Sequence, residues 1–144
     1  MRLEAELPKY AHDGDSGMDV ALPEEILLTP GKPLFIDLGF ALEIPPGYEG
    51  QIRSRSGLTK KGLTACSGIG TIDASYRSSV GITLLWNCTP DSSWHDTWRL
   101  KRGDRVAQLV IAPVARARLV EVESLDALRT TDRKGGFGSA GIGP

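Results

Sequence analysis

Short alternating and β-rich segments dominate the pattern of hydrophobic and polar residues along this chain of 144 residues. The segment at 34–38 is interpreted as alternating, and a second apolar run follows at 40–44. Further runs with β-branched members lie at 80–86, 105–111 and 115–123. Segments of this length and period predict β-strands.

Turn residues separate these strands, and no long helix is predicted. Proline and glycine mark turns at 29–31, 45–47 and 102–104. Glycine and proline number 17 and 9 in the whole chain, which implies many short elements. Only 58–63 and 124–128 are predicted to form one or two helical turns. The pattern therefore predicts an all-β domain of the sandwich, jelly-roll or barrel type.

Composition narrows the class of protein further. The length suits one domain, and 40% hydrophobic with 24% charged residues is typical of a folded globular chain. A net charge of −1, without a long Lys/Arg block, argues against nucleic-acid binding. The chain has neither an apolar run long enough for a membrane span nor a signal-peptide pattern. Cys66 and Cys88 lack metal or disulfide-framework spacing, so we expect reduced thiols in a cytoplasmic protein.

Five polar groups interrupt the apolar pattern, and two of them suit charged ligands. The group at 15–20 contains Asp19 at the start of a possible strand, which turn chemistry alone could explain. The group at 53–58 combines arginines, hydroxyls and Gly57 before a possible helical turn. That combination suits an anion, because arginine binds phosphate oxygens in a fork and a helix start presents free N–H groups. Solvated loop arginines are the alternative.

The remaining three groups are at 70–81, 103–109 and 133–139. In the first, Asp73 stands among small and apolar residues without a local partner, so it either caps a hairpin turn or performs chemistry. In the second, Gln108 interrupts an apolar strand, so it pairs with a core group or faces a ligand. The third places one aromatic between glycines, which either closes over a ligand or forms a flexible end.

In this order and spacing the five groups resemble the signature motifs of the trimeric dUTPases, the deoxyuridine triphosphate nucleotidohydrolases. The resemblance covers about 15–141 and is strongest in RSGL (55–58), GTIDASYR (70–77), GDRVAQL (103–109) and GGFGSAG (135–141). It implies a β-clip or jelly-roll-like distorted barrel with one short helical segment, assembled as a homotrimer. Residues 1–130 would form the core, and 131–144 a mobile C-terminal arm that closes over an active site at a subunit interface.

The same resemblance implies Mg²⁺-dependent hydrolysis of dUTP to dUMP and pyrophosphate, which keeps uracil out of DNA and supplies dUMP. Asp73 is the implied general base for the water that attacks the α-phosphate, and Asp19 would contact Mg²⁺ through water. Tyr76 would pack on the deoxyribose and Phe137 would stack on uracil. The implied substrate-binding residues are Arg55, Ser56, Gly57, Ser67, Gly70, Thr71, Ile72, Asp73, Tyr76, Gly81, Gln108, Arg133, Lys134, Phe137, Gly138 and Ser139.

Two regions depart from the family pattern. The arginine of the last motif usually stands five residues before the aromatic, but here Asp132 occupies that place. Either Arg133 or Lys134 is therefore left to bind the γ-phosphate. The segment at 88–102 is longer than usual and contains Trp94, His95 and Trp98, so it forms either a loop at a subunit contact or a partner-binding surface.

Three other functions are alternatives. A dCTP deaminase shares the fold, but its strand after the hairpin carries a glutamate, and 81–87 contains no acid here. A non-catalytic nucleotide-sensing or partner-binding trimer would not need Asp73. A purely structural jelly roll would need none of the polar groups.

Overall fold

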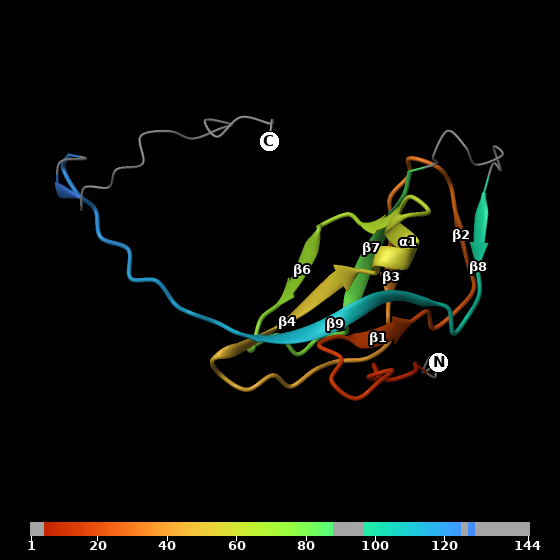
Figure 1. Cartoon of the computed structure of the whole chain (residues 1–144), viewed down its shortest axis with the longest axis horizontal. Helices are drawn as coiled ribbons and strands as arrows, with labels where there is room; N and C mark the ends of the chain where they lie inside the picture. The colour runs from red at the N-terminus through yellow and green to blue at the C-terminus, as the bar shows by residue number, and fades with distance from the viewer. Residues whose placement is uncertain (1–4, 88–96, 125–126, 129–144) are drawn as a thin grey trace.

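The computed structural model describes residues 5–87, 97–124 and 127–128 of the chain (Figure 1). Within these residues the protein is almost entirely β, which confirms the predicted fold class. The elements in chain order are β1 (Met18–Ala21), β2 (Ile26–Leu28), β3 (Leu34–Asp37), β4 (Tyr48–Ser54), α1 (Ser56–Thr59), β5 (Leu63–Ala65), β6 (Ile69–Ile72), β7 (Gly81–Trp86), β8 (Trp98–Leu100) and β9 (Arg105–Pro113).

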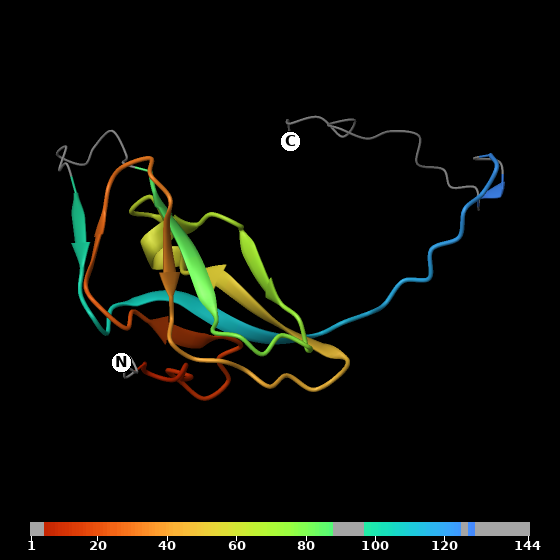
Figure 2. The ribbon, with the colours of Figure 1, turned by 180° about the vertical axis from the view of Figure 1, so that it is seen from behind.

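The strands form three antiparallel sheets in the described part of the chain. The largest has the order β1-β9-β4-β6, a second has β3-β7-β5, and β2 pairs only with β8. β4 lies between β6 and β9 and is paired with both over most of its length. Neighbours in a sheet come from distant parts of the chain, so residues far apart in sequence meet on one surface (Figures 1 and 2).

One hydrophobic core joins the three sheets. Alternation places Ile52 of β4, Ile36 of β3 and Leu28 of β2 in the same buried cluster. No polar or charged residue of the described segments is buried. The largest fully buried side chains are Leu22, Leu28, Leu38, Leu63, Leu84, Leu109, Val20 and Val80.

Three predicted strands are confirmed and two are not. The predictions at 34–38, 80–86 and 105–111 correspond to β3, β7 and β9. The run at 40–44 is not a strand, although Phe40 and Ile44 are buried. Its apolar pattern reports packing against the core rather than pairing in a sheet, because burial and backbone pairing are separate requirements.

The segment at 115–123 alternates like a strand but forms none in the single chain. It extends away from the sheets in both views (Figures 1 and 2), and Leu119 is 92% exposed. A strand needs a second backbone to receive its hydrogen bonds, and the described part of one chain offers this segment no partner strand.

Helical structure is slight. The predicted turns at 58–63 begin earlier and end sooner than expected, because α1 covers Ser56–Thr59 and Leu63 already starts β5. At 124–128, Ala127 N–H donates to the Ser124 carbonyl, while 125–126 lie outside the described residues. None of the helical structure described is long and apolar enough to cross a membrane.

Candidate active site

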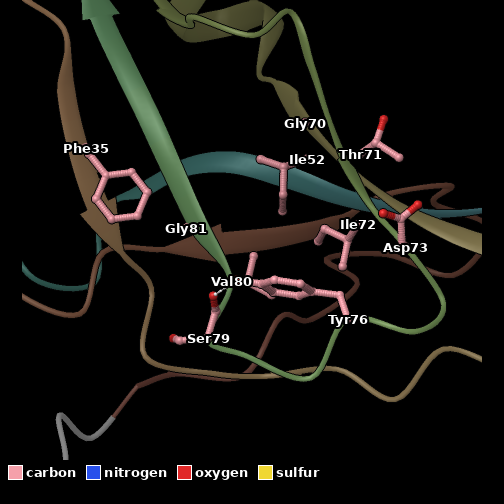
Figure 3. Close-up of a pocket in the computed structure, with 10 residues that line it drawn as sticks. All are labelled: Phe35, Ile52, Gly70, Thr71, Ile72, Asp73, Tyr76, Ser79, Val80 and Gly81. Carbon is pink, nitrogen blue, oxygen red and sulfur yellow. Dashed lines mark hydrogen bonds between the residues drawn. The ribbon is translucent and has the colours of Figure 1, made fainter.

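A pocket of about 300 Å³ opens between β6 and the start of β7 (Figure 3). We call it the hairpin pocket, after the connection at 73–80 that closes it. Six predicted site residues line it, together with four that were not predicted. The lining residues are Phe35, Ile52, Gly70, Thr71, Ile72, Asp73, Tyr76, Ser79, Val80 and Gly81.

Asp73 stands at the end of β6, where alternation turns its side chain outward. Ile72 points into the pocket toward Tyr76, whereas Thr71 and Asp73 lie on the other side of the strand (Figure 3). Asp73 is exposed, and no side-chain or backbone donor of the described residues binds its carboxylate. Only its backbone carbonyl takes part in the turn, by accepting from Tyr76 N–H at 3.0 Å. The interpretation of Asp73 as a hairpin cap is therefore not supported.

The hairpin beyond Asp73 is held by side-chain hydrogen bonds to its own backbone. Arg77 Nη1 donates to the carbonyls of Ala74 and Tyr76, at 2.7 and 2.8 Å. The Tyr76 hydroxyl donates to the Ser79 carbonyl at 3.0 Å. The Tyr76 ring consequently lies across the pocket between the two arms of the hairpin (Figure 3).

Gly81 lies beneath an aromatic ring on the adjacent strand. A Cβ at this position would stand 2.5 Å from both Cε2 and Cζ of Phe35. Asp37 pairs with Gly81 across β3 and β7, and Phe35 is 67% exposed on the outer face of β3. A side chain at position 81 would therefore require the exposed ring of Phe35 to shift.

The backbone of β6 offers hydrogen-bonding groups to a ligand. β6 is the last strand of its sheet and pairs only with β4 in the described structure. The outward-facing N–H and C=O groups of an edge strand have no strand partner, so they can bind a planar polar group placed beside them. The pocket therefore combines an apolar interior with a row of backbone donors and acceptors.

A second pocket, of about 470 Å³, carries the charges. Its centre is Asp19 on β1, whose side chain is 18% exposed. Arg55 Nε lies 3.1 Å from one carboxylate oxygen, and Arg105 Nη1 donates to the other at 2.9 Å. Arg55 also donates from Nη1 to the Arg105 carbonyl at 2.8 Å. We call Asp19, Arg55 and Arg105 the arginine patch.

Gln108 lines the same pocket as the arginine patch. Its Nε2 donates to the Ser54 carbonyl at 3.1 Å, which supplies the partner that a polar side chain in a strand needs. Gly17 packs so closely that a Cβ there would stand 2.6 Å from Gln108 Oε1. Ser56 completes the predicted residues in this pocket.

The two pockets lie toward opposite ends of β4. Asp73 follows Ile72, which pairs with Gly50 near the start of β4, whereas Arg55 follows Ser54 at its end. Asp73 therefore lies level with residue 49, six residues before Arg55. In an extended strand this corresponds to about 20 Å, at ~3.3 Å per residue. Among the residues that the structure describes, none lines both pockets. One chain therefore does not bring Asp73 and Arg55 to the same reacting group.

Some predicted residues lie elsewhere. Ser67 is in the turn before β6, and its Oγ would be 3.6 Å from a Cβ at Gly70. Gly57 lies in α1, next to Ser56. The predictions for Arg133, Lys134, Phe137, Gly138 and Ser139, and those for Trp94 and His95, concern positions outside the described residues. Trp98 starts β8, and its ring packs edge-on against Trp86 at 5.5 Å between centroids.

Sequence reasoning missed Phe35 and Arg105. Phe35 lies within a predicted strand and Arg105 begins another. Each is an outward-facing residue, one large and apolar, the other charged, and this was the feature that could have indicated a site. Their roles depend on strand pairing, because β3 meets β7 and β9 meets β1 only in the folded chain.

Comparisons with known proteins show the family of this chain. A sequence model of the dUTPase family matches residues 3–141. The deoxyuridine 5'-triphosphate nucleotidohydrolase of Anaeromyxobacter sp. is 44% identical over 137 residues, which span 94% of this chain and 88% of that protein. The corresponding protein of Gloeothece citriformis is 42% identical over 138 residues, 94% and 89% of the two chains.

Solved structures give the same answer. The dUTPase of Staphylococcus bacteriophage 80alpha, determined with dUpNHpp, has a TM-score of 0.82 at 28% identity and covers 99% of this chain and 96% of its own. The dUTPase from phage phi11 of S. aureus, for which a structural Mg(II) ion is described, has a TM-score of 0.75 at 29% identity, over 88% and 96% of the two chains. The resemblance found in the sequence is confirmed: this chain belongs to the dUTPase family.

Proposed function

We propose that this chain hydrolyses dUTP to dUMP and pyrophosphate, as a dUTP diphosphatase. The observation that carries the proposal is the hairpin pocket, where an outward carboxylate borders an apolar slot along a strand edge, and neither has a partner among the described residues. Its volume of about 300 Å³ is at the small end of the range for small-molecule sites. Its relatives are named deoxyuridine 5'-triphosphate nucleotidohydrolases, which supports the same substrate.

Asp73 acts as the general base. An ionised carboxylate is an acceptor only, so it can orient a water molecule by one hydrogen bond and take the proton as that water attacks the α-phosphorus. The apolar residues beside it, Ile72 and Ala74, are at least half-buried and pack on the core. A base fixed in this way keeps its water in line for attack.

Base and sugar selection come from the walls of the hairpin pocket. The backbone edge of β6 reads the polar edge of uracil, where a mismatched base would leave donors or acceptors unpaired. The Tyr76 ring, fixed by its hydroxyl bond to Ser79, packs on the deoxyribose where a ribose 2′-hydroxyl would need room.

The phosphates bind to the arginine patch of another copy of the chain. Arg55 offers a planar guanidinium suited to phosphate oxygens, with Ser56, Gly57 and Gln108 beside it. Because this group lies about 20 Å from Asp73 in one chain, a complete site needs a second copy, as a homotrimer with interface sites provides. The alternating segment at 115–123 supports such an assembly, since its backbone needs a partner strand.

The donor set of the site fits Mg²⁺ that arrives with the triphosphate. No group of three or more His, Cys, Asp or Glu side chains gathers in the described residues, and Asp19 is already paired with two arginines. This donor set suits an ion that keeps most of its water ligands. Asp19 would contact the ion through one of these water molecules. When bound, Mg²⁺ would neutralise part of the phosphate charge.

The last motif would complete the site. Phe137 would stack on uracil, and Gly138, Ser139 and either Arg133 or Lys134 would bind the γ-phosphate as the arm at 131–144 closes.

Pyrophosphate release measured with Mg²⁺ tests the function. We expect turnover of dUTP, with UTP, dTTP and dCTP slower by orders of magnitude, because selectivity of about 10⁴ is available from buried polar pairing. Ammonia release from dCTP would support the deaminase instead. Tight dUTP binding without pyrophosphate release would support the non-catalytic sensor.

A further inference from the structure

We propose that Asp37, acting through Ser79, is a positioning residue that fixes the Tyr76 ring and thereby sets discrimination between deoxyribose and ribose. The inference rests on the proposed function, since it concerns selection at the same pocket. Asp37 lies at the end of β3, on a different element from the hairpin that carries Tyr76.

A chain of hydrogen bonds links these residues. Ser79 Oγ donates to Asp37 Oδ1, and the N–H of Gly39 donates to the same carboxylate oxygen at 2.9 Å. The Phe40 carbonyl, 3.4 Å from Ser79 Oγ, is a second and more distant acceptor for this hydroxyl. The Tyr76 hydroxyl then donates to the Ser79 carbonyl at 3.0 Å. The backbone carbonyl of Ser79 therefore accepts the hydrogen bond from Tyr76, while the Ser79 side chain is hydrogen-bonded to Asp37 of β3.

The Tyr76 ring depends on this anchor because packing does not hold it. The residue is 43% exposed, so its ring is not enclosed by the core. Its near end is fixed by Arg77, which bonds the Tyr76 carbonyl at 2.8 Å. In the described structure the far end has one hydrogen bond, to Ser79, and Figure 3 shows the ring pointing along that bond.

The Asp37 carboxylate is suited to hold Ser79 firmly. The hydroxyl of Ser79, and then the N–H of Gly39, lower the pKa of Asp37 below its usual value. The group therefore stays ionised at neutral pH, and hydrogen bonds to an ionised acceptor are stronger than those between neutral groups.

The backbone around this link is secured independently. Leu38 N–H donates to the Val80 carbonyl at 2.9 Å, and Val80 N–H donates to the Phe40 carbonyl at 2.8 Å. Val80 itself is 2% exposed and belongs to the core. Removing the Asp37 side chain should leave the Ser79–Val80 peptide and the pairing of β3 with β7 in place, since the Val80 N–H keeps its bond to Phe40. It should free the Ser79 side chain and the turn before it, which carries Tyr76.

The experiment measures the ratio of kcat/KM for dUTP to kcat/KM for UTP in Asp37→Ala and Ser79→Ala. Each should lower this ratio by about tenfold, the effect of one hydrogen bond to a charged group, chiefly by improving UTP. Ser75→Ala is the matched control, because Ser75 lies in the same hairpin and makes no side-chain hydrogen bond in the described structure. Its ratio should equal that of the wild type.

Two further variants separate positioning from a general loss of structure. Asp37→Asn keeps an acceptor for Ser79 and Gly39, so it should restore most of the ratio lost in Asp37→Ala. Tyr76→Phe removes only the hydroxyl at the end of the chain of bonds. Combined with Asp37→Ala, it should lower the ratio little further, because both changes release the same ring.

The outcomes distinguish the two proposals. An unchanged ratio in Asp37→Ala and Ser79→Ala overturns the positioning role while dUTP turnover by the wild type keeps the proposed function. Additive effects of Asp37→Ala and Tyr76→Phe also overturn it. Should Asp37→Ala fail to fold, a wild-type ratio in Ser79→Ala decides against the role by itself. A wild type without dUTP turnover overturns both.

Discussion

The hairpin pocket and the arginine patch are built on the same sheet by different means. The hairpin pocket is made of backbone edges, apolar side chains and an aromatic ring, and its one carboxylate, Asp73, has no protein partner in the described structure. In the arginine patch every charge is paired, with Asp19 between Arg55 and Arg105. The first is suited to a ligand's shape and hydrogen-bonding pattern, whereas the second holds oriented guanidinium groups.

This difference accounts for their separation along β4. A base that must accept a proton works best with an unpaired carboxylate, and two arginines beside it would hold that carboxylate instead of water. The chain keeps Asp73 and the arginines about 20 Å apart, and an assembly of copies can bring together what one copy keeps separate. Substitutions in the hairpin pocket and in the arginine patch should therefore have different effects.

Asp73→Asn should give the largest effect. The amide cannot accept the proton from water, so kcat for dUTP should fall by about 10²–10⁴-fold, while dUTP binding stays close to that of the wild type. Steady-state pyrophosphate release and calorimetric titration measure the two quantities.

Asp13→Asn is the control for that loss, since Asp13 lines neither pocket and its side chain accepts no hydrogen bond in the described segments. Turnover by Asp73→Asn within threefold of the wild type would remove Asp73 from the role of general base.

Arg55→Ala tests the charged region. Loss of a charge-assisted phosphate contact should weaken dUTP binding by about 10–100-fold. Binding of deoxyuridine, which carries no phosphate, should not change. Lys32→Ala removes a positive charge from the turn before β3 and should leave both affinities as they are. Equal losses for dUTP and deoxyuridine would show that the two regions do not divide recognition in this way.

Mixing the two inactive variants sharpens the comparison directly. When Asp73→Asn and Arg55→Ala chains are unfolded together and refolded in equal amounts, random assembly into shared sites should leave about one quarter of them intact. Roughly that share of wild-type kcat/KM should return, measured at low dUTP. Mixed chains as inactive as the separate ones would place Asp73 and Arg55 of one site in the same copy.

Gly81→Ala disturbs only the hairpin pocket. The added methyl would meet the Phe35 ring at 2.5 Å, so this exposed ring must turn aside, at a cost of about 0.5–1.5 kcal/mol for a displaced rotamer, seen in thermal unfolding or in nucleoside binding. Phe35→Ala in the same chain removes the obstruction and should recover most of the loss. Failure of this second change to recover either quantity would mean that the contact with Phe35 does not limit the site.

The sequence indicates some members of each region but not their placement. The resemblance to the dUTPase motifs implies Asp73, Tyr76 and Gly81 as site residues, and these three line one pocket. Nothing in the linear pattern reveals that Phe35 covers Gly81 or that Arg105 pairs with Asp19, because both contacts depend on register between distant strands. The three-residue strands β2, β5 and β8 escape prediction for another reason: they are too short to display a period.

The smallest effect concerns the pH dependence of stability at Asp37. Its pKa is lowered by the Ser79 hydroxyl and by the Gly39 N–H, so the folded state binds the proton less readily than the unfolded state. This stabilisation is present above the unfolded pKa of about 3.9 and is lost as pH falls through the lower folded value. Asp37→Asn should therefore melt below the wild type at pH 6, and the difference should shrink as the pH falls below about 4. Glu24→Gln, at an exposed position without a side-chain hydrogen bond in the described residues, should follow the wild type more closely. A gap between Asp37→Asn and wild type that is as wide in acid as at pH 6 would mean that the carboxylate contributes by shape and not by charge.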